Sequence, residues 1–79
     1  MARLPSVSGA QLARLLEKLG YRFVRQKGSH ARYTLLTENG EHHVTVPLHA
    51  TMAKGTLNDI LTQVALHTGH SKDDLISQL

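Results

Sequence analysis

Two short turn signals divide the middle of the chain, and they constrain its fold more than any other feature. Gly28-Ser29 separates residues 21–27 from residues 30–37, and Asn39-Gly40 separates that second run from residues 41–46. All three runs are rich in residues that favour strands. Because glycine adopts the positive φ that two-residue hairpin loops need, the sequence predicts a three-stranded antiparallel meander with a type II′ first turn.

The two turns also predict which side of this sheet meets the core. Counting outward from each loop pairs Tyr33 with Val24 in the first hairpin and with Val46 in the second. Directly opposed residues project from the same face of a sheet. The face expected to meet the core carries Val24, Tyr33, Leu35, Val44 and Val46. The opposite face carries Arg25, Lys27, His30, Arg32, Thr34, His43 and Thr45.

This predicted register sets Arg25 opposite Arg32, which is a like-charge pair. Such a pair costs about a few tenths of a kcal/mol in a sheet. A phosphate bound between the two guanidinium groups would turn that cost into a gain. The alternative is that both long side chains extend into water, where their repulsion matters little.

A helical pattern precedes the strands. Ser8 and Gln11 have the spacing of a capping box, and Gly20 provides a stop at the other end. Between them, one apolar stripe at helical spacing consists of Leu12, Leu15, Leu16 and Leu19. The sequence predicts a first helix over residues 9–19.

Two further helices are expected after the strands. Thr56 and Asp59 form a possible capping box at the start of the second helix, which runs to about residue 66 or 68 before Gly69. Ser71 caps a last short helix that extends through Leu79. The expected fold class is therefore α+β, in the order α-β-β-β-α with a short C-terminal helix.

Length and composition narrow the class of protein. A chain of 79 residues forms one domain, expected over residues 1–79, and has no cysteine for disulfides or thiolate metal sites. Its N-terminus lacks the apolar stretch of a signal peptide, and no apolar run is long enough to cross a bilayer. We expect a soluble, cytoplasmic protein without membrane contact. The formal net charge of +3, with the basic residues concentrated in the middle, favours a polyanionic partner.

The six histidines do not have metal-ligand spacing, since adjacent His42 and His43 on a strand point to opposite faces. We expect no metal and no cofactor. His30 differs because it follows a tight turn among cations, where an imidazole could take the proton of a ribose 2′-hydroxyl. An ordinary turn histidine is the competing interpretation. Lys54-Gly55-Thr56 likewise has two interpretations, a phosphate site of helix N–H groups or a helix cap.

Three segments of the chain resemble the HicA family of toxin ribonucleases. They are Val24-Arg25-Gln26-Lys27-Gly28-Ser29-His30, Val44-Thr45-Val46-Pro47-Leu48-His49 and Lys54-Gly55-Thr56-Leu57, continuing to Ile60-Leu61. The resemblance implies a fold similar to double-stranded RNA-binding domains, with both main helices on one sheet face. It also implies an mRNA interferase of a type II toxin–antitoxin pair, neutralised by a HicB-like antitoxin. By the same match, the family's catalytic histidine falls on His30, Gly28 and Ser29 shape its turn, and Lys27 contacts phosphate.

The leading hypothesis is an endoribonuclease that cleaves mRNA with a single catalytic histidine, His30. The residues expected to bind RNA are Arg25, Lys27, Gly28, Ser29, Arg32 and Lys54. A second proton-transfer residue is not evident, and His43 and His49 are candidates only by residue type. The alternative is a non-catalytic RNA-binding or protein-interaction module on the same fold, because fold does not fix function.

Overall fold

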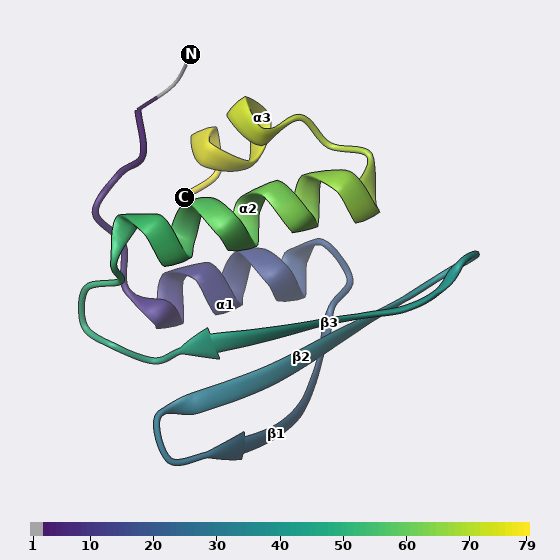
Figure 1. The fold of residues 1–79 in the computed structure, drawn as a ribbon, viewed down its shortest axis with the longest axis horizontal. Helices are drawn as coiled ribbons and strands as arrows, with labels where there is room; N and C mark the ends of the chain where they lie inside the picture. The colour runs from purple at the N-terminus through teal and green to yellow at the C-terminus, as the bar shows by residue number, and fades with distance from the viewer. Residues whose placement is uncertain (1–2) are drawn as a thin grey trace.

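The elements follow one another in the predicted order. The computed structural model describes residues 3–79 and places three helices on one side of a three-stranded antiparallel sheet (Figure 1). The elements are α1 (Gly9–Lys18), β1 (Arg22–Lys27), β2 (His30–Thr37), β3 (Gly40–Pro47), α2 (Lys54–Thr68) and α3 (Lys72–Ser77). The α+β class and the α-β-β-β-α order with a short C-terminal helix are confirmed.

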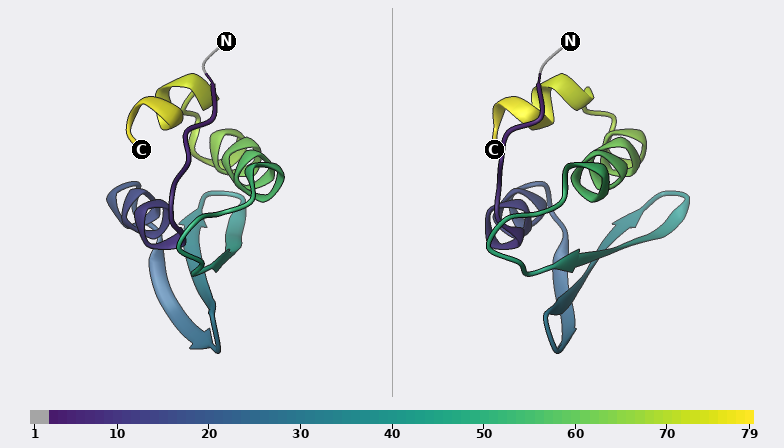
Figure 2. Two further views of the ribbon diagram at one scale, coloured as in Figure 1. Left: turned by 90° about the vertical axis from the view of Figure 1, so that its left-hand side faces the viewer. Right: turned by 60° about the vertical axis from the view of Figure 1, so that its left-hand side comes forward.

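The helices form the upper layers of the molecule and leave one sheet face uncovered. α1 and α2 lie against the same face of the sheet, and α3 packs on α2 on the side away from the sheet (Figures 1 and 2). The core between these layers is apolar and includes Leu12, Leu16, Val46, Leu57, Leu61, Val64 and Leu75. Within residues 3–79, no helix combines the length and the apolar character needed to span a membrane.

The start of α1 confirms the predicted capping box. The N–H of Gln11 donates to the Ser8 hydroxyl over 3.1 Å, and the Ser8 N–H donates to the Gln11 side chain over 2.8 Å. These two bonds satisfy backbone donors that a helix N-terminus otherwise leaves unpaired. The helix ends at Lys18, one residue before the expected end, and Gly20 follows with a φ of +105°.

α2 begins earlier than expected, and the Thr56 capping box is wrong. Ala53 occupies the N-cap position without a side-chain hydrogen bond, so Thr56 lies inside the helix. The preceding loop is held by tertiary contacts instead, because the Met52 N–H donates to the Val7 carbonyl over 2.8 Å and the Met52 side chain is buried. Gly69, with a φ of +77°, ends the helix as predicted.

The second hairpin turns one position earlier than predicted. Its loop is Glu38-Asn39, and Thr37 pairs with Gly40 across it. Gly40 alone takes a positive φ, of +118°, and the Thr37 hydroxyl donates to the Gly40 carbonyl over 2.8 Å. The glycine therefore serves the start of β3 rather than the loop itself.

This change shifts the register of β2 and β3 by two residues. Tyr33 pairs with Val44 instead of Val46, and Leu35 pairs with His42. Because side chains alternate with a period of two, a two-residue shift leaves every residue on its predicted face. Tyr33, Val44 and Val46 are buried as expected, and Leu35 is partly buried.

β1 keeps the predicted register only near its turn. Lys27 pairs with His30, as expected, but Phe23 rather than Val24 pairs with Tyr33. The register shifts between Phe23 and Arg25, which makes Val24 the extra residue of a β-bulge. The expectation that Val24 belongs to the core is therefore wrong, and its side chain is 53% exposed.

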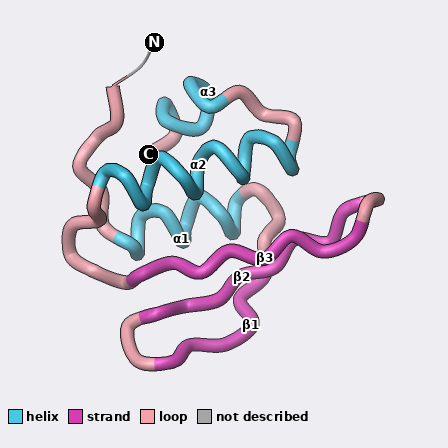
Figure 3. Tube along the Cα trace, viewed as in Figure 1, coloured by secondary structure: helices cyan, strands magenta, loops and turns pink. Residues whose placement is uncertain are grey.

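The hairpin of β2 and β3 extends beyond the helices at one end of the molecule, where its loop is the tip seen in Figure 3. Leu36 lies near this tip and is 78% exposed. At the opposite end, the turn between β1 and β2 meets the end of β3, and α2 begins on the same side of the view but above them, in the helix layer (Figures 1 and 2). That second end is where the candidate site lies.

Candidate active site

The helix-free face of the sheet collects the predicted cations. Lys27 pairs with His30, and Arg25 pairs with Arg32, as the first turn predicted. These residues alternate with the buried residues of β2, so they project away from the helix layer. The like-charge pair expected from the sequence is therefore present on an uncovered surface.

His30 is the first residue of β2 and follows the tight turn directly. Gly28 has a φ of +59°, as the first position of a type II′ turn requires, and Ser29 completes the loop. His30 pairs with Lys27 on one side and with Pro47 of β3 on the other. Its side chain is exposed, so the imidazole can reach a bound polyanion.

A second histidine lies beside His30. The ring centroids of His30 and His49 are 6.4 Å apart, and the two ring planes meet at 73°. His49 belongs to the loop after β3, which backbone hydrogen bonds fix on two sides. The Leu48 N–H donates to the Ser29 carbonyl over 2.6 Å, and the Gly9 N–H donates to the His49 carbonyl over 3.0 Å.

The sequence provided one signal for this pair. Once His30 is known to pair with Pro47, residue 49 lies only two positions beyond the partner of His30. The predicted pairing of Tyr33 with Val46 also leads to residue 49 opposite His30, three positions further along, but the third strand was expected to end at residue 46.

His43, the other histidine considered as a second catalytic group, lies elsewhere on the same face. It pairs with Thr34, and its Nδ1 is 2.7 Å from the Thr34 hydroxyl oxygen. Its Nε2 is 3.4 Å from a carboxylate oxygen of Glu41. Its strand position is therefore four positions along β2 from that of His30.

A shallow groove of about 480 Å³ continues from the cationic pair along this face. It is lined by Arg22, Phe23, Val24, Arg32, Thr34, Leu36, Glu41 and His43. Arg32 joins the groove to the His30 end, because it lies two residues along β2 on the same face. Sequence reasoning missed Arg22, Val24 and Leu36 as residues that line this groove. The alternation of β2 could have identified Leu36, whereas the bulge hid the place of Val24.

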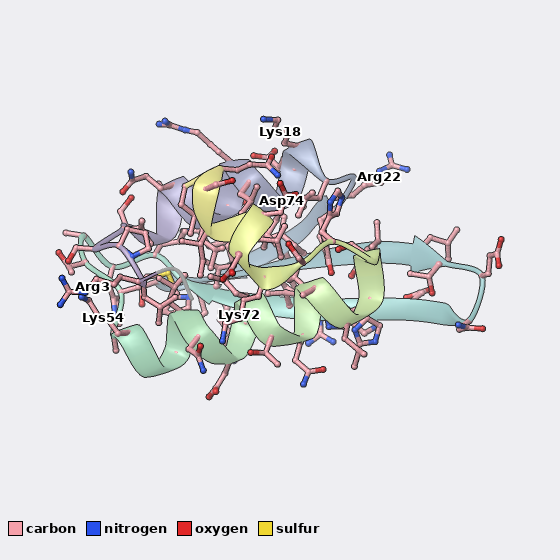
Figure 4. All side chains as sticks on the ribbon, turned by 90° about the horizontal axis from the view of Figure 1, so that it is seen from above. Arg3, Lys18, Arg22, Lys54, Lys72 and Asp74 are labelled. Atoms are coloured by element: carbon pink, nitrogen blue, oxygen red, sulfur yellow. The ribbon has the colours of Figure 1, made fainter. Side chains whose placement is uncertain are left out.

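Lys54 is set apart from the hairpin residues. It is the first residue of α2, in the helix layer rather than in the sheet. Figure 4 shows it at the end of the molecule opposite Arg22, the end that also carries the turn between β1 and β2. No side chain caps the α2 N-terminus, so its N–H groups remain available to an anion.

A separate histidine cluster lies at the other end of the sheet. The Tyr21 hydroxyl is 2.6 Å from Nδ1 of His42, and His42 stacks on His67 with centroids 3.7 Å apart. Burial, followed by the charges of His67 and His43, lowers the pKa of His42. Burial raises the pKa of Tyr21 to about 12. Across residues 3–79, no group of three or more His, Cys, Asp or Glu side chains is arranged to hold a metal ion.

Comparison with known proteins supports the resemblance noted in the sequence. Residues 9–66 match the family described as HicA toxin of bacterial toxin–antitoxin. No curated protein matches the chain, and no solved structure does so either. The family match covers all elements from α1 to most of α2, including the whole sheet that carries His30. The chain therefore belongs to the HicA toxin family.

Proposed function

We propose that this chain is an endoribonuclease that cleaves mRNA, with His30 as its catalytic residue. The observation that carries the proposal is the exposed imidazole of His30 at the end of a cationic sheet face, opposite Lys27. RNA supplies its own nucleophile, the ribose 2′-hydroxyl, so an imidazole and nearby cations suffice for the chemistry. Membership of a toxin family supports the same activity.

His30 moves a proton at the scissile ribose-phosphate, either from the 2′-hydroxyl or to the leaving oxygen. Lys27 lies directly opposite and stabilises the negative charge that develops on the phosphate. Arg25 and Arg32 bind neighbouring phosphates, which relieves the repulsion between the two guanidinium groups. Placing a general base or acid in this way accelerates a reaction by about 10²–10⁴-fold.

Gly28 and Ser29 form the turn that positions His30. Gly28 provides the positive φ, and Ser29 offers its carbonyl to the Leu48 N–H, so the turn is tied to the end of β3. Both residues also lie where the RNA backbone approaches His30. Lys54 and the uncapped N-terminus of α2 supply a further phosphate contact at the same end of the molecule.

The biological partners follow from the family. A HicB-like antitoxin neutralises the toxin, and mRNA in the cytoplasm is its substrate. Leu75 of α3 is packed in the same core as α1 and α2. This shared core supports treating residues 1–79 as a single HicA-like toxin domain.

The proposal is tested by incubating purified, antitoxin-free protein with a long RNA, beside the variants His30→Ala and His70→Ala. His70 is an exposed histidine paired with Asp74 next to α3, so His70→Ala is the matched control. We expect cleavage by the parent and by His70→Ala, and a loss of at least about a hundredfold in His30→Ala. If His30→Ala cleaved RNA as fast as the parent, the catalytic residue would have to be another one. Binding without cleavage by the parent would favour the non-catalytic RNA-binding module.

A further inference from the structure

The structure brings two imidazoles to one place although 19 positions separate them in the sequence. The rings of His30 and His49 are 6.4 Å apart, and both side chains are exposed on the surface. This separation is too large for a direct hydrogen bond between the rings. It is small enough for both rings to reach oxygen atoms of one phosphodiester, since each hydrogen bond spans about 2.6–3.2 Å.

The backbone holds His49 in this position, and the imidazole takes no part in that support. The His49 carbonyl accepts a hydrogen bond from the Gly9 N–H, and the adjacent Leu48 N–H donates to the Ser29 carbonyl in the turn before His30. Two backbone hydrogen bonds therefore fix the loop of His49 to α1 and to the turn of His30. These bonds fix the backbone of His49, which keeps its imidazole within reach of His30.

We propose that His49 is the second proton-transfer residue of the site, acting with His30 as a general acid–base pair. The inference rests on the proposed ribonuclease function. It extends that function, because the reaction removes a proton from the 2′-hydroxyl and delivers one to the leaving oxygen, and a second imidazole would assist the transfer that His30 does not carry out.

The step balances with these two groups and RNA alone. The 2′-oxygen forms a bond to phosphorus while the bond between phosphorus and the 5′-oxygen breaks. One neutral imidazole accepts the 2′-hydroxyl proton, and the other, protonated imidazole donates a proton to the departing 5′-oxygen. The products are a 2′,3′-cyclic phosphate and a 5′-hydroxyl, and proton exchange with water restores both histidines.

The other polar side chains of the sheet do not offer an equivalent partner for His30. His43 lies beside Thr34 and Glu41, four residues further along the sheet. Tyr33 is buried on the opposite, helix-covered face, and burial raises its pKa. Lys27 is adjacent to His30 across the strand pair, and its ammonium group suits phosphate binding.

The test uses two forms of one short RNA whose cleaved linkage has first been mapped with the parent protein. The second form carries sulfur in place of the 5′-oxygen at that linkage, so its leaving group departs without protonation. We expect His49→Ala to cleave the ordinary RNA at least about a hundredfold more slowly than the parent. Its affinity for a cleavage-resistant 2′-O-methyl copy of the RNA should stay close to that of the parent. The sulfur substrate should restore cleavage in one of the variants His30→Ala and His49→Ala, namely the one lacking the general acid.

Three results would contradict the proposal that His30 and His49 act as an acid–base pair. The first is parent-like cleavage of ordinary RNA by His49→Ala, the second is a loss explained by weaker binding, and the third is an equal loss on both substrates in both variants. Thermal unfolding of His49→Ala checks that it folds, which we expect because, within residues 3–79, the hydrogen bonds that hold His49 come from its backbone. If the parent cleaves no RNA, the proposed function itself fails. If His30→Ala is inactive while His49→Ala is active, only this inference fails.

Discussion

The backbone N–H of Gly9 donates a hydrogen bond to the carbonyl oxygen of His49 over 3.0 Å. This bond brings the first residue of α1 against the end of β3 so closely that a side chain there has no room. A Cβ at Gly9 would lie 2.2 Å from the Pro47 carbonyl oxygen and 2.7 Å from the Leu48 Cα. Both atoms belong to the backbone, so neither can rotate away.

Gly9→Ala is therefore expected to destabilise the fold by about 1–3 kcal/mol, the cost typical of overpacking. The higher helix propensity of alanine opposes this effect by at most about 1 kcal/mol. Urea unfolding measures the change in the free energy of unfolding. Displacement of the loop should also slow RNA cleavage by more than the loss of folded protein accounts for.

Gly55→Ala is the matched control, because Gly55 is also in the first turn of a helix. A Cβ at Gly55 would meet nothing within 4 Å, so alanine should stabilise the protein by up to about 1 kcal/mol. Equal effects of the two substitutions would show that the close approach at Gly9 does not exist in solution.

The sheet shows which errors a sequence-based prediction tolerates. The misplaced second turn shifted the partner of Tyr33 by two residues, from Val46 to Val44, and left the core face intact. The bulge at Val24 is different, because one extra residue in one strand breaks the alternation that the prediction used. Nothing in the local sequence marks this bulge, so Val24 was wrongly assigned to the core.

The candidate site also has one part that the sequence predicts and another that depends on tertiary contacts. Lys27 and His30 could be placed together because a two-residue turn connects their strands. The approach of His49 depends on how the loop after β3 runs, and tertiary hydrogen bonds determine that path. The start of α2 at Lys54 has the same cause, since the Met52 anchor to the Val7 carbonyl replaces a side-chain cap.

Stability should depend on pH through His42. Burial and the neighbouring His67 and His43 lower its pKa in the folded state, whereas the unfolded chain has the ordinary value of 6.5. The unfolded chain therefore binds the proton more readily as pH falls below about 6.5. We expect the contribution of neutral His42 to be fully present above this pH and to be lost as pH falls through the lowered pKa.

Comparing urea unfolding of the parent and of His42→Gln between about pH 5 and pH 8 isolates this effect, because the other histidines are common to both proteins and ordinary carboxylates titrate below that range. Glutamine does not titrate, so the free energy of unfolding should fall less toward acid in the variant. The same pH dependence in both proteins would mean that His42 protonates as easily in the folded state as in the unfolded state.

The facing pair Arg25 and Arg32 gives opposite expectations for stability and for RNA binding. Arg32→Gln should leave stability unchanged or raise it by about a few tenths of a kcal/mol, because it removes the like-charge pair. It should weaken RNA binding and reduce the slope of log affinity against log salt by about 0.7 if one phosphate contact on a single strand is lost. Filter binding to RNA at several salt concentrations measures the affinity and its salt dependence. Urea unfolding measures the stability. Arg14→Gln, on the exposed surface of α1, is the control. An equal change of slope in that variant would mean that Arg25 and Arg32 do not form a specific RNA-binding surface.

The last helix lies beyond the family match, which ends at residue 66, yet it contributes to the core. Leu75 of α3 is 0% exposed, and the Lys72 ammonium donates a hydrogen bond to the Asn58 side chain of α2. Replacing a fully buried leucine by alanine removes apolar contacts and leaves a cavity, so Leu75→Ala should cost about 2–5 kcal/mol. Leu66→Ala is the control, because Leu66 is 74% exposed and its truncation should change stability by less than about 0.5 kcal/mol. Urea unfolding measures both variants, and a negligible effect of Leu75→Ala would mean that α3 does not pack on α2 in solution.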